Sequence, residues 1–210
     1  GRVLGQVRHP LSTMDFSSFL LQAQSSGASV IGLANAGNDL RNTINQAREF
    51  GIVDKPKLVG LVVLVLDVHS LGLEKAKGLQ LAESFYWDRT DASRALSRRF
   101  FDRVGRMPTM NQAGGYSAAF HYLRAVKETG TIDANAVLAW LRSNKLSDAT
   151  MDEAWVRDDG RMMRDYYAFT VKSPTESKAP WDYYRLDRTV TADEAARPRE
   201  IGGCPPGAKR

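Results

Sequence analysis

Segments with strand character and segments with helix character alternate over the first eighty residues, and this alternation limits the fold more than any other feature. Residues 3–7, 30–33 and 58–66 are apolar and contain the valines typical of strands. Two segments between them, which begin at Asp15 and Asp39, carry apolar side chains at helical spacing, and each is followed by a glycine that can end a helix. This order predicts a parallel sheet with right-handed crossovers, and the run 58–66 predicts a strand covered by helices on both faces.

The remaining residues predict a group of helices followed by more strands. The expected elements are a strand over 78–84, helices over 91–104, 111–129 and 133–144, a hairpin of 154–157 with 165–171, and a strand over 183–190. The turn Asp158-Asp159-Gly160 supplies the positive φ angles that a tight hairpin needs. The three helices have too little sheet in their own part of the chain to cover, and residues 197–210 predict a loosely held tail. The predicted fold class is α/β, with a Rossmann-like parallel sheet flanked by helices.

The composition is that of a globular chain and excludes several classes of protein. Hydrophobic residues make up 43% of the 210 residues and charged residues 25%, which leaves ample apolar surface for a core. The net charge of +5 is spread along the chain, so no nucleic-acid surface is predicted. The longest apolar run has nine residues, too few to span a membrane as a helix, and the opening residues resemble a strand rather than a signal peptide. The single Cys204 cannot form an internal disulfide, which leaves the redox compartment open.

The motifs of common enzyme classes are missing from the sequence. No glycine-rich dinucleotide or phosphate loop follows a strand, and no G-x-S-x-G turn occurs. His9, His69 and His121 stand far apart and lack the spacing of helix-borne metal ligands. The sequence therefore predicts neither catalysis nor a cofactor nor a metal site.

Two polar loops follow apolar strands of the expected sheet, at residues 35–38 and 67–70. Ligands of open α/β sheets lie outside the carboxyl ends of the strands, so both loops are candidate binding segments. The first loop could equally begin a helix that is capped by Asn38 or Asp39. Asp67 could cap a helix, serve as a loop carboxylate, or hold a cationic or hydrogen-bonding group of a ligand.

Several runs of the sequence, taken in order, resemble the type I periplasmic binding proteins, the branched-chain amino acid receptors of ABC importers. The matching runs are 8–11 (RHPL), 15–23 (DFSSFLLQA), 33–37 (LANAG), 113–118 (AGGYSA), 157–162 (RDDGRM), 172–177 (KSPTES) and 181–184 (WDYY). They extend over nearly the whole chain, and several runs in family order are far more specific than any one of them.

This resemblance implies two Rossmann-like lobes joined by a hinge that the chain crosses three times, which close on a small solute without catalysis. A full receptor is nearly twice as long, so the chain resembles a C-terminal half. Residues 1–78 and 162–192 would belong to the second lobe, residues 83–157 would return to the first lobe, and residues 193–210 would form the tail. A signal peptide, the first-lobe sheet and any disulfide partner of Cys204 would lie upstream, and the implied localisation is periplasmic.

The resemblance also assigns ligand-binding residues. The candidates are Asn35, Ala36, Gly37, Asp67, His69 and Tyr116. The first three fall where these receptors present a second-lobe contact, often an aromatic one, and the small residues here depart from that pattern. Asp67 and His69 lie where the family places an acidic residue that holds the ammonium of an amino acid. Tyr116 would form a wall for the side chain of the solute or pack in the core.

The implied partners are a small organic solute, a membrane permease of the ABC type, and either a missing N-terminal half or a second copy of the chain. No nucleic acid and no cofactor is implied. Branched-chain or other amino acids, amides and aromatic acids all remain open as solutes. A ligand-sensing regulatory domain of the same fold is the alternative function, and a doubly wound α/β enzyme is the rival from another class.

Overall fold

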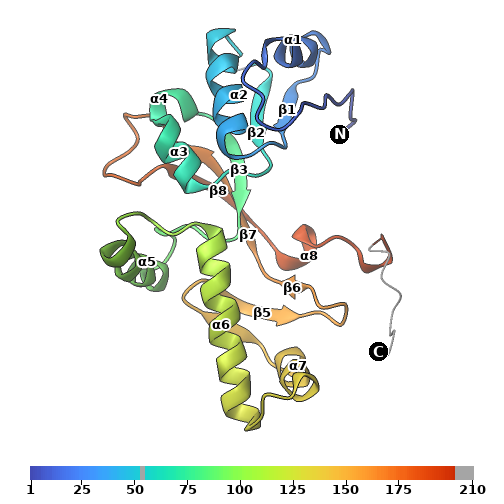
Figure 1. Ribbon diagram of the computed structural model, residues 1–210, viewed down its shortest axis with the longest axis vertical. Coiled ribbons are helices and arrows are strands. Elements are labelled where there is room, and N and C mark those ends of the chain that lie inside the picture. The colour runs from blue at the N-terminus through green and yellow to red at the C-terminus, as the bar shows by residue number, and fades with distance from the viewer. Residues whose placement is uncertain (53–54, 202–210) are drawn as a thin grey trace. The chain divides into compact units, whose positions relative to one another are not determined.

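The computed structural model describes residues 1–52 and 55–201, which divide into two compact units (Figure 1). Unit 1 comprises Gly1–Glu83 and Ala168–Arg188, and unit 2 comprises Ser84–Tyr167 and the residues from Thr189 onward. The chain therefore passes from one unit to the other at three places. Within the described residues, no helix is both long enough and apolar enough to cross a membrane.

Unit 1 is built on a five-stranded sheet with the strand order β1-β2-β3-β7-β8. The strands are β1 (Val30–Leu33), β2 (Lys57–Gly60), β3 (Gln80–Glu83), β7 (Tyr166–Val171) and β8 (Tyr184–Val190), and the helices are α1 (Ser17–Ser25), α2 (Gly37–Glu49), α3 (Val65–Leu71) and α4 (Leu73–Ala76). The pairs β1–β2 and β2–β3 are parallel, and α2, α3 and α4 lie in the connections between these strands. The predicted α/β class, with a Rossmann-like parallel sheet flanked by helices, is confirmed.

The two faces of this sheet differ in burial. The strand register places Leu33, Gly60 and Leu81 on one face, and all three are buried. On the other face Val30 is 49% exposed and Val59 is half-buried. This second face also carries Lys57 and Gln80, which pair with Val30 and Val59. Parallel sheets normally have both faces covered by helices, so it is a largely apolar surface that the described residues leave partly open.

Helix α2 shows why the predicted elements form at the expected places. Leu40 and Ile44 are spaced four residues apart and are fully buried, which gives the helix one apolar side. Gly51 follows the helix with a φ of +70°, a conformation that ends helices and favours glycine. The predicted strand over 30–33 and the predicted helix near Asp39 are therefore confirmed.

The predicted strand over 58–66 is wrong in its second half. β2 ends at Gly60, and α3 begins at Val65. A Cβ atom at Gly60 would lie 2.0 Å from Val63 Cγ2, so only glycine allows the chain to turn back over the strand end here. Val65 and Val68 are then buried at helical spacing. A continuous apolar run does not distinguish a buried strand from a buried helix, and this one contains both.

The predicted strand over 3–7 does not form in the described structure. Val3 is 86% exposed, and none of the described strands pairs with this segment. A short strand without a partner is not stable in water, which explains the difference. The residues that follow attach to α2 instead, because Gln46 donates a hydrogen bond to Met14 O at 2.7 Å and accepts one from Phe16 N–H at 2.6 Å.

Unit 2 combines long helices with a small antiparallel sheet. Its elements are α5 (Asp91–Val104), α6 (Met110–Thr129), α7 (Ala134–Ser143), β4 (Leu146–Asp148), β5 (Met151–Val156), β6 (Met162–Met163), α8 (Ala192–Ala195) and a 3-10 turn η1 (Arg199–Ile201). Thr90 and Thr109 cap α5 and α6 through their hydroxyl groups, and Gly105 and Gly130 end the two helices in the left-handed conformation. The three predicted helices are confirmed to within one residue at each end.

The predicted hairpin forms with a different second strand. β5 pairs antiparallel with β6, with Trp155 opposite Met163. Arg157 N–H donates to Arg161 O across the predicted turn at 2.8 Å. β7, which was the predicted partner, pairs in the five-stranded sheet instead. The six-residue β7 alternates intermediate and buried positions, a pattern that suits a sheet with one well-covered face.

The predicted loose tail makes contacts with other residues of unit 2 over the part that the structure describes. The 3-10 turn η1 lies in this part of the chain, directly after α8. The Arg157 guanidinium donates to Arg197 O at 3.3 Å, and Arg199 forms an ion pair with Asp158. These contacts correct the expectation for residues up to 201. Cys204 lies outside the described residues.

A buried polar cluster ties α6 to the end of β4 in unit 2. Ser117 Oγ donates to Asp148 Oδ2 at 2.6 Å, and His121 Nε2 lies 3.0 Å from the same oxygen. Asp148 Oδ1 accepts from Thr150 N–H at 2.6 Å. Burial by itself raises the pKa of Asp148, but the hydrogen bonds from Ser117 and Thr150 outweigh it and bring the pKa below the ordinary value of 3.8. The carboxylate form of Asp148 therefore stabilises unit 2.

We expect Asp148→Asn to lower the free energy of unfolding by about 2 kcal/mol near neutral pH, because hydrogen bonds to charged groups contribute roughly 1.5–3 kcal/mol. A folded-state pKa below 3.8 means that this contribution is present above 3.8 and is lost as the pH falls further. In urea unfolding, the gap between the unmodified chain and the variant should shrink as the pH is lowered through this range. Asp102→Asn, at an exposed position of α5, is the control and should change little. A gap that stays constant at acid pH would contradict this account.

Candidate functional site

The carboxyl ends of β1 and β2 lie at the same edge of the sheet in unit 1. Because these strands are parallel, with Leu33 opposite Gly60, the loops that leave them start side by side. Leu61 N–H donates to Leu33 O at 2.9 Å and holds the second loop to the end of β1. Open α/β sheets bind ligands at this kind of edge, so it is the candidate functional site.

The loop after β1 contains the predicted residues Asn35, Ala36 and Gly37. Asn35 Nδ2 donates to Thr43 Oγ1 in α2 at 2.8 Å, while Asn35 Oδ1 is buried without a hydrogen-bond partner in the described part of the chain. Ala36 is exposed, and Gly37 begins α2 with a φ of +59°, which other residues rarely adopt. Ala36 occupies the capping position of α2, and its methyl side chain cannot accept a hydrogen bond. The first turn of α2 therefore has no side-chain cap.

Asn38 and Asp39 lie inside the first turn of α2, and neither occupies the capping position. Asn38 Oδ1 accepts from Arg41 Nη2, and Asp39 Oδ2 accepts from Ser12 N–H at 3.1 Å. The alternative in which one of these two side chains caps the helix is therefore wrong.

Asp67 stands in the first turn of α3, not in a loop, and is 7% exposed. Its Oδ2 accepts from Leu64 N–H at 3.0 Å, and its Oδ1 lies 3.4 Å from Arg41 Nη1. Burial raises the pKa of Asp67 above the ordinary value, and the bond from Leu64 and the charge of Arg41 oppose it only in part. Of the alternatives left open by the sequence, the capping role is the one observed. Arg41 in turn links this carboxylate to Asn38, beside the loop after β1.

His69 lies two residues further along α3 and contacts a different part of unit 1. Its ring stacks on Trp181, with 4.0 Å between the ring centroids and 7° between the planes. Its Nδ1 lies 2.7 Å from the hydroxyl of Tyr183. Asp67 therefore contacts Arg41 near the candidate edge, whereas His69 contacts the segment before β8.

Tyr116 belongs to α6 of unit 2. It is 37% exposed and stacks on Phe120, with ring centroids 5.9 Å apart. Packing in the core, one of the two alternatives for this residue, is wrong for the described structure. A role as a wall for the solute stays a prediction.

Sequence reasoning missed Arg41, Leu61 and Val62 at this edge. The position of Arg41 between α2 and α3 depends on how the two helices pack. The strand predicted over 58–66 includes Leu61 and Val62, but in the structure they form the turn after β2. Gly60 was the available signal, because glycine inside a strand often marks a bend or a close approach of another group.

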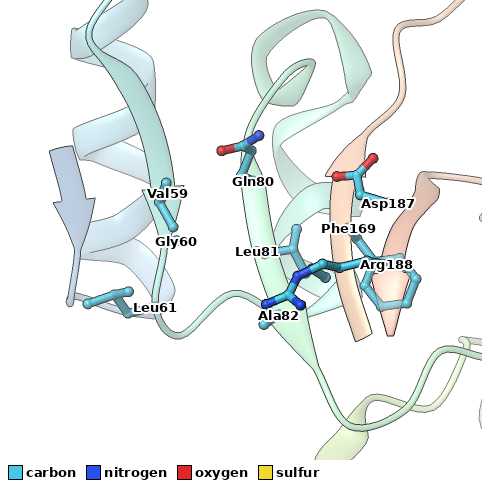
Figure 2. Close-up of a pocket in the computed structure, with 10 residues that line it drawn as sticks. Val59, Gly60, Leu61, Gln80, Leu81, Ala82, Phe169, Asp187 and Arg188 are labelled. Atoms are coloured by element: carbon cyan, nitrogen blue, oxygen red, sulfur yellow. The ribbon is translucent and has the colours of Figure 1, made fainter. Parts of the chain in front are cut away.

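A hollow of about 420 Å³ lies on the partly open face of the sheet in unit 1 (Figure 2). It is lined by Val59, Gly60, Leu61, Gln80, Leu81, Ala82, Ala168, Phe169, Asp187 and Arg188. Most of the exposed lining is apolar, and Asp187 and Arg188 come from β8 at one side. Apolar sheet faces pack against helices in α/β proteins, so the hollow suits packing better than it suits a polar ligand. Among the described residues, no cluster of His, Cys, Asp and Glu has the composition of a metal site.

The fold and the position of this edge are those of the open α/β proteins that place ligands outside the carboxyl ends of their strands. The sequence model of the periplasmic binding protein family matches residues 1–178. The chain therefore belongs to the periplasmic binding protein family. No curated protein sequence matches the chain significantly.

Solved structures of type I periplasmic binding proteins resemble the chain. A periplasmic binding protein of Burkholderia mallei shares 48% identity and a TM-score of 0.89 over 95% of the chain and 53% of its own length. A branched-chain amino acid ABC transporter periplasmic ligand-binding protein of Burkholderia xenovorans shares 43% identity and a TM-score of 0.85 over 93% of the chain and 52% of its own length. The chain thus spans about half the length of these relatives.

A more distant likeness concerns the fold alone. A solute-binding protein of an ABC transporter of Rhodopseudomonas palustris, solved with 3,4-dihydroxybenzoic acid, shares 19% identity and a TM-score of 0.70. The likeness covers 85% of the chain and 49% of that protein.

We expect Asp67→Ala to lower the free energy of unfolding by about 1 kcal/mol, since the loss of a helix cap costs roughly 0.5–2 kcal/mol. The variant removes the acceptor for Leu64 N–H and leaves Arg41 without this carboxylate. Urea unfolding measures the change, and Glu49→Ala, at an exposed position near the end of α2, is the matched control. Unchanged stability combined with a loss of solute affinity would show that Asp67 acts on the solute instead.

Proposed function

We propose that the chain is part of a solute receptor of an ABC importer, which binds a small organic solute and delivers it to a membrane permease. The observation that carries this proposal is the 48% identity to the Burkholderia mallei periplasmic binding protein across 95% of the chain. The relative from Burkholderia xenovorans is described as a periplasmic ligand-binding protein, which supports the same function. In this proposal the protein acts in the periplasm, by binding and without catalysis.

The proposed solute site uses the carboxyl edge of unit 1, with Asn35, Ala36 and Gly37 as one wall. The exposed Ala36 leaves room for a solute, and the start of α2 offers backbone N–H groups to a polar or anionic group of the solute. Asp67 and His69 remain candidates, but a solute that used them would have to replace their present contacts with Arg41 and Trp181. Tyr116 is proposed as a solute contact on unit 2.

The solute classes proposed are amino acids, amides and aromatic acids. The Burkholderia xenovorans relative belongs to a branched-chain amino acid transporter, and the more distant Rhodopseudomonas palustris protein was solved with 3,4-dihydroxybenzoic acid. Branched-chain amino acids and aromatic acids both combine a carboxylate with an apolar body. A site of this fold with a polar edge and small neutral side chains suits such a compound.

We also propose that the 210 residues act together with the remaining half of a longer receptor. Solved relatives are about twice as long as the chain, which covers 53% and 52% of their lengths. Unit 1 leaves an apolar sheet face partly open, and α6 of unit 2 exposes Phe120 at 40% and Leu123 at 63%. Exposed apolar surface of this kind marks a site of interaction. In this proposal residues 1–78 and 162–192 form most of the second lobe, residues 83–157 return to the first lobe, and residues 193–210 form the tail.

Separate measurements on the 210-residue chain and on a complete receptor test the two parts of the proposal. We expect light scattering to show that the chain alone self-associates through its apolar surfaces, and thermal-shift assays to show weak solute binding or none. The complete receptor should be monomeric and should be stabilised by at least one amino acid, amide or aromatic acid. A monomeric 210-residue chain with micromolar affinity for an amino acid would contradict the half-receptor proposal. A complete receptor that binds no compound of these classes would contradict the receptor function.

A further inference from the structure

We propose that the arginines of α5 bind anionic phospholipid headgroups, so that unit 2 holds the receptor at the surface of the membrane that contains its permease. The inference rests on the proposed function, which places the receptor beside that membrane. It adds a lipid surface to the partners of the chain and does not depend on which solute is bound.

Helix α5, which lies at one side of unit 2 in Figure 1, concentrates the positive charge of the chain. Residues 91–106 include five arginines and two aspartates, and these account for three of the five net positive charges of the sequence. Arg98, Arg99, Arg103 and Arg106 form what we call the arginine surface, and all four are exposed. Arg99 and Arg103 are four residues apart, so they lie on the same side of the helix.

The arginine surface is not neutralised by ion pairs. In the first half of α5, Arg94 pairs with Asp91 at 2.6 Å and with Asp88 at 3.0 Å. Among the residues that the structure describes, by contrast, none forms an ion pair or a side-chain hydrogen bond with the four side chains of the arginine surface. The exposed Asp102 is the one carboxylate in this half of the helix, so the arginine surface keeps most of its charge. Its field is therefore directed at whatever approaches from solvent.

The remaining side of α5 is turned toward the protein. Ser93 and Ser97 are buried, and Leu96 and Phe100 are half-buried. Val104, at 45%, is the only large apolar side chain of α5 that is exposed. The exposed side of the helix thus offers charge with almost no apolar surface, and it suits contact with a charged layer rather than insertion into an apolar one.

This composition favours a phospholipid surface over an acidic protein as the partner. Protein interfaces gain most of their binding energy from aromatic or arginine anchors that enter desolvated pockets, and the exposed side of α5 has no exposed aromatic residue. An anionic membrane attracts each arginine that comes within the Debye length, and it needs no pocket. The planar guanidinium group also donates two parallel hydrogen bonds to the oxygens of a phosphate.

The test measures sedimentation of the complete receptor with vesicles of phosphatidylglycerol and phosphatidylcholine in equal parts, and with vesicles of phosphatidylcholine alone. We expect binding to the anionic vesicles only, with loss of binding in about 1 M salt, where the Debye length falls to about 3 Å. Arg99→Gln/Arg103→Gln should weaken binding by about tenfold or more. Arg99→Lys/Arg103→Lys keeps the charge and should stay within about threefold.

The matched control is Lys127→Gln/Arg197→Gln, which removes the same charge from exposed positions elsewhere in unit 2. It should weaken vesicle binding by less than about threefold. Thermal unfolding of all three variants should match the unmodified receptor, because every altered side chain is exposed.

Several results would overturn the inference. One is the absence of binding to anionic vesicles at low salt, and another is a loss in the control as large as that in Arg99→Gln/Arg103→Gln, which would show that net charge alone acts. Displacement from the vesicles by inorganic phosphate, beyond that by sodium chloride of equal ionic strength, would indicate a site for free phosphate. A melting temperature lowered only in Arg99→Gln/Arg103→Gln would show that these arginines pack against another part of the receptor. Binding through Arg99 and Arg103 to the permease in neutral vesicles, without binding to anionic vesicles, would identify an acidic protein surface as the partner.

The test contains no solute, so the inference and the proposed function can fail separately. A receptor that binds a solute but not the anionic vesicles contradicts the inference alone. A receptor that binds no solute contradicts the proposed function, whatever its behaviour with vesicles.

Discussion

Parallel pairing of β1 with β2 is the constraint on which the rest of the account depends. The register runs over four residue pairs, from Val30 opposite Lys57 to Leu33 opposite Gly60, and it brings both carboxyl ends to one edge. The bond from Leu61 N–H to Leu33 O continues this alignment into the turn after β2. Backbone pairing therefore brings the start of α2 next to the turn that follows β2.

The sequence was sufficient to predict a helix or strand where local chemistry marks both of its ends. Helix α5 is the clearest case, since Thr90 accepts from Ser93 N–H at its start and Gly105 adopts the left-handed conformation at its end. It was insufficient over 58–66, because the end of β2 depends on Val63 packing against Gly60, a contact that periodicity does not reveal. It was also insufficient over 3–7, since a strand forms only where another strand is present to accept its hydrogen bonds.

The candidate site was predictable to the extent that it follows from strand order. The loop with Asn35, Ala36 and Gly37 follows β1, so its place at the carboxyl edge is a consequence of the predicted fold. The partners of Asp67 and His69 could not be predicted in the same way. Arg41 lies 26 residues from Asp67, and Tyr183 lies 114 residues from His69, so both pairings depend on how helices and loops pack in unit 1.

The structure of the complete receptor with its solute bound is the most direct test of the central claim. The account predicts that the solute lies at the carboxyl edge of unit 1, next to the loop with Asn35 and Ala36. Atoms of the solute should lie within about 4 Å of Ala36, the range of direct contact. A solute bound away from this edge would contradict the account.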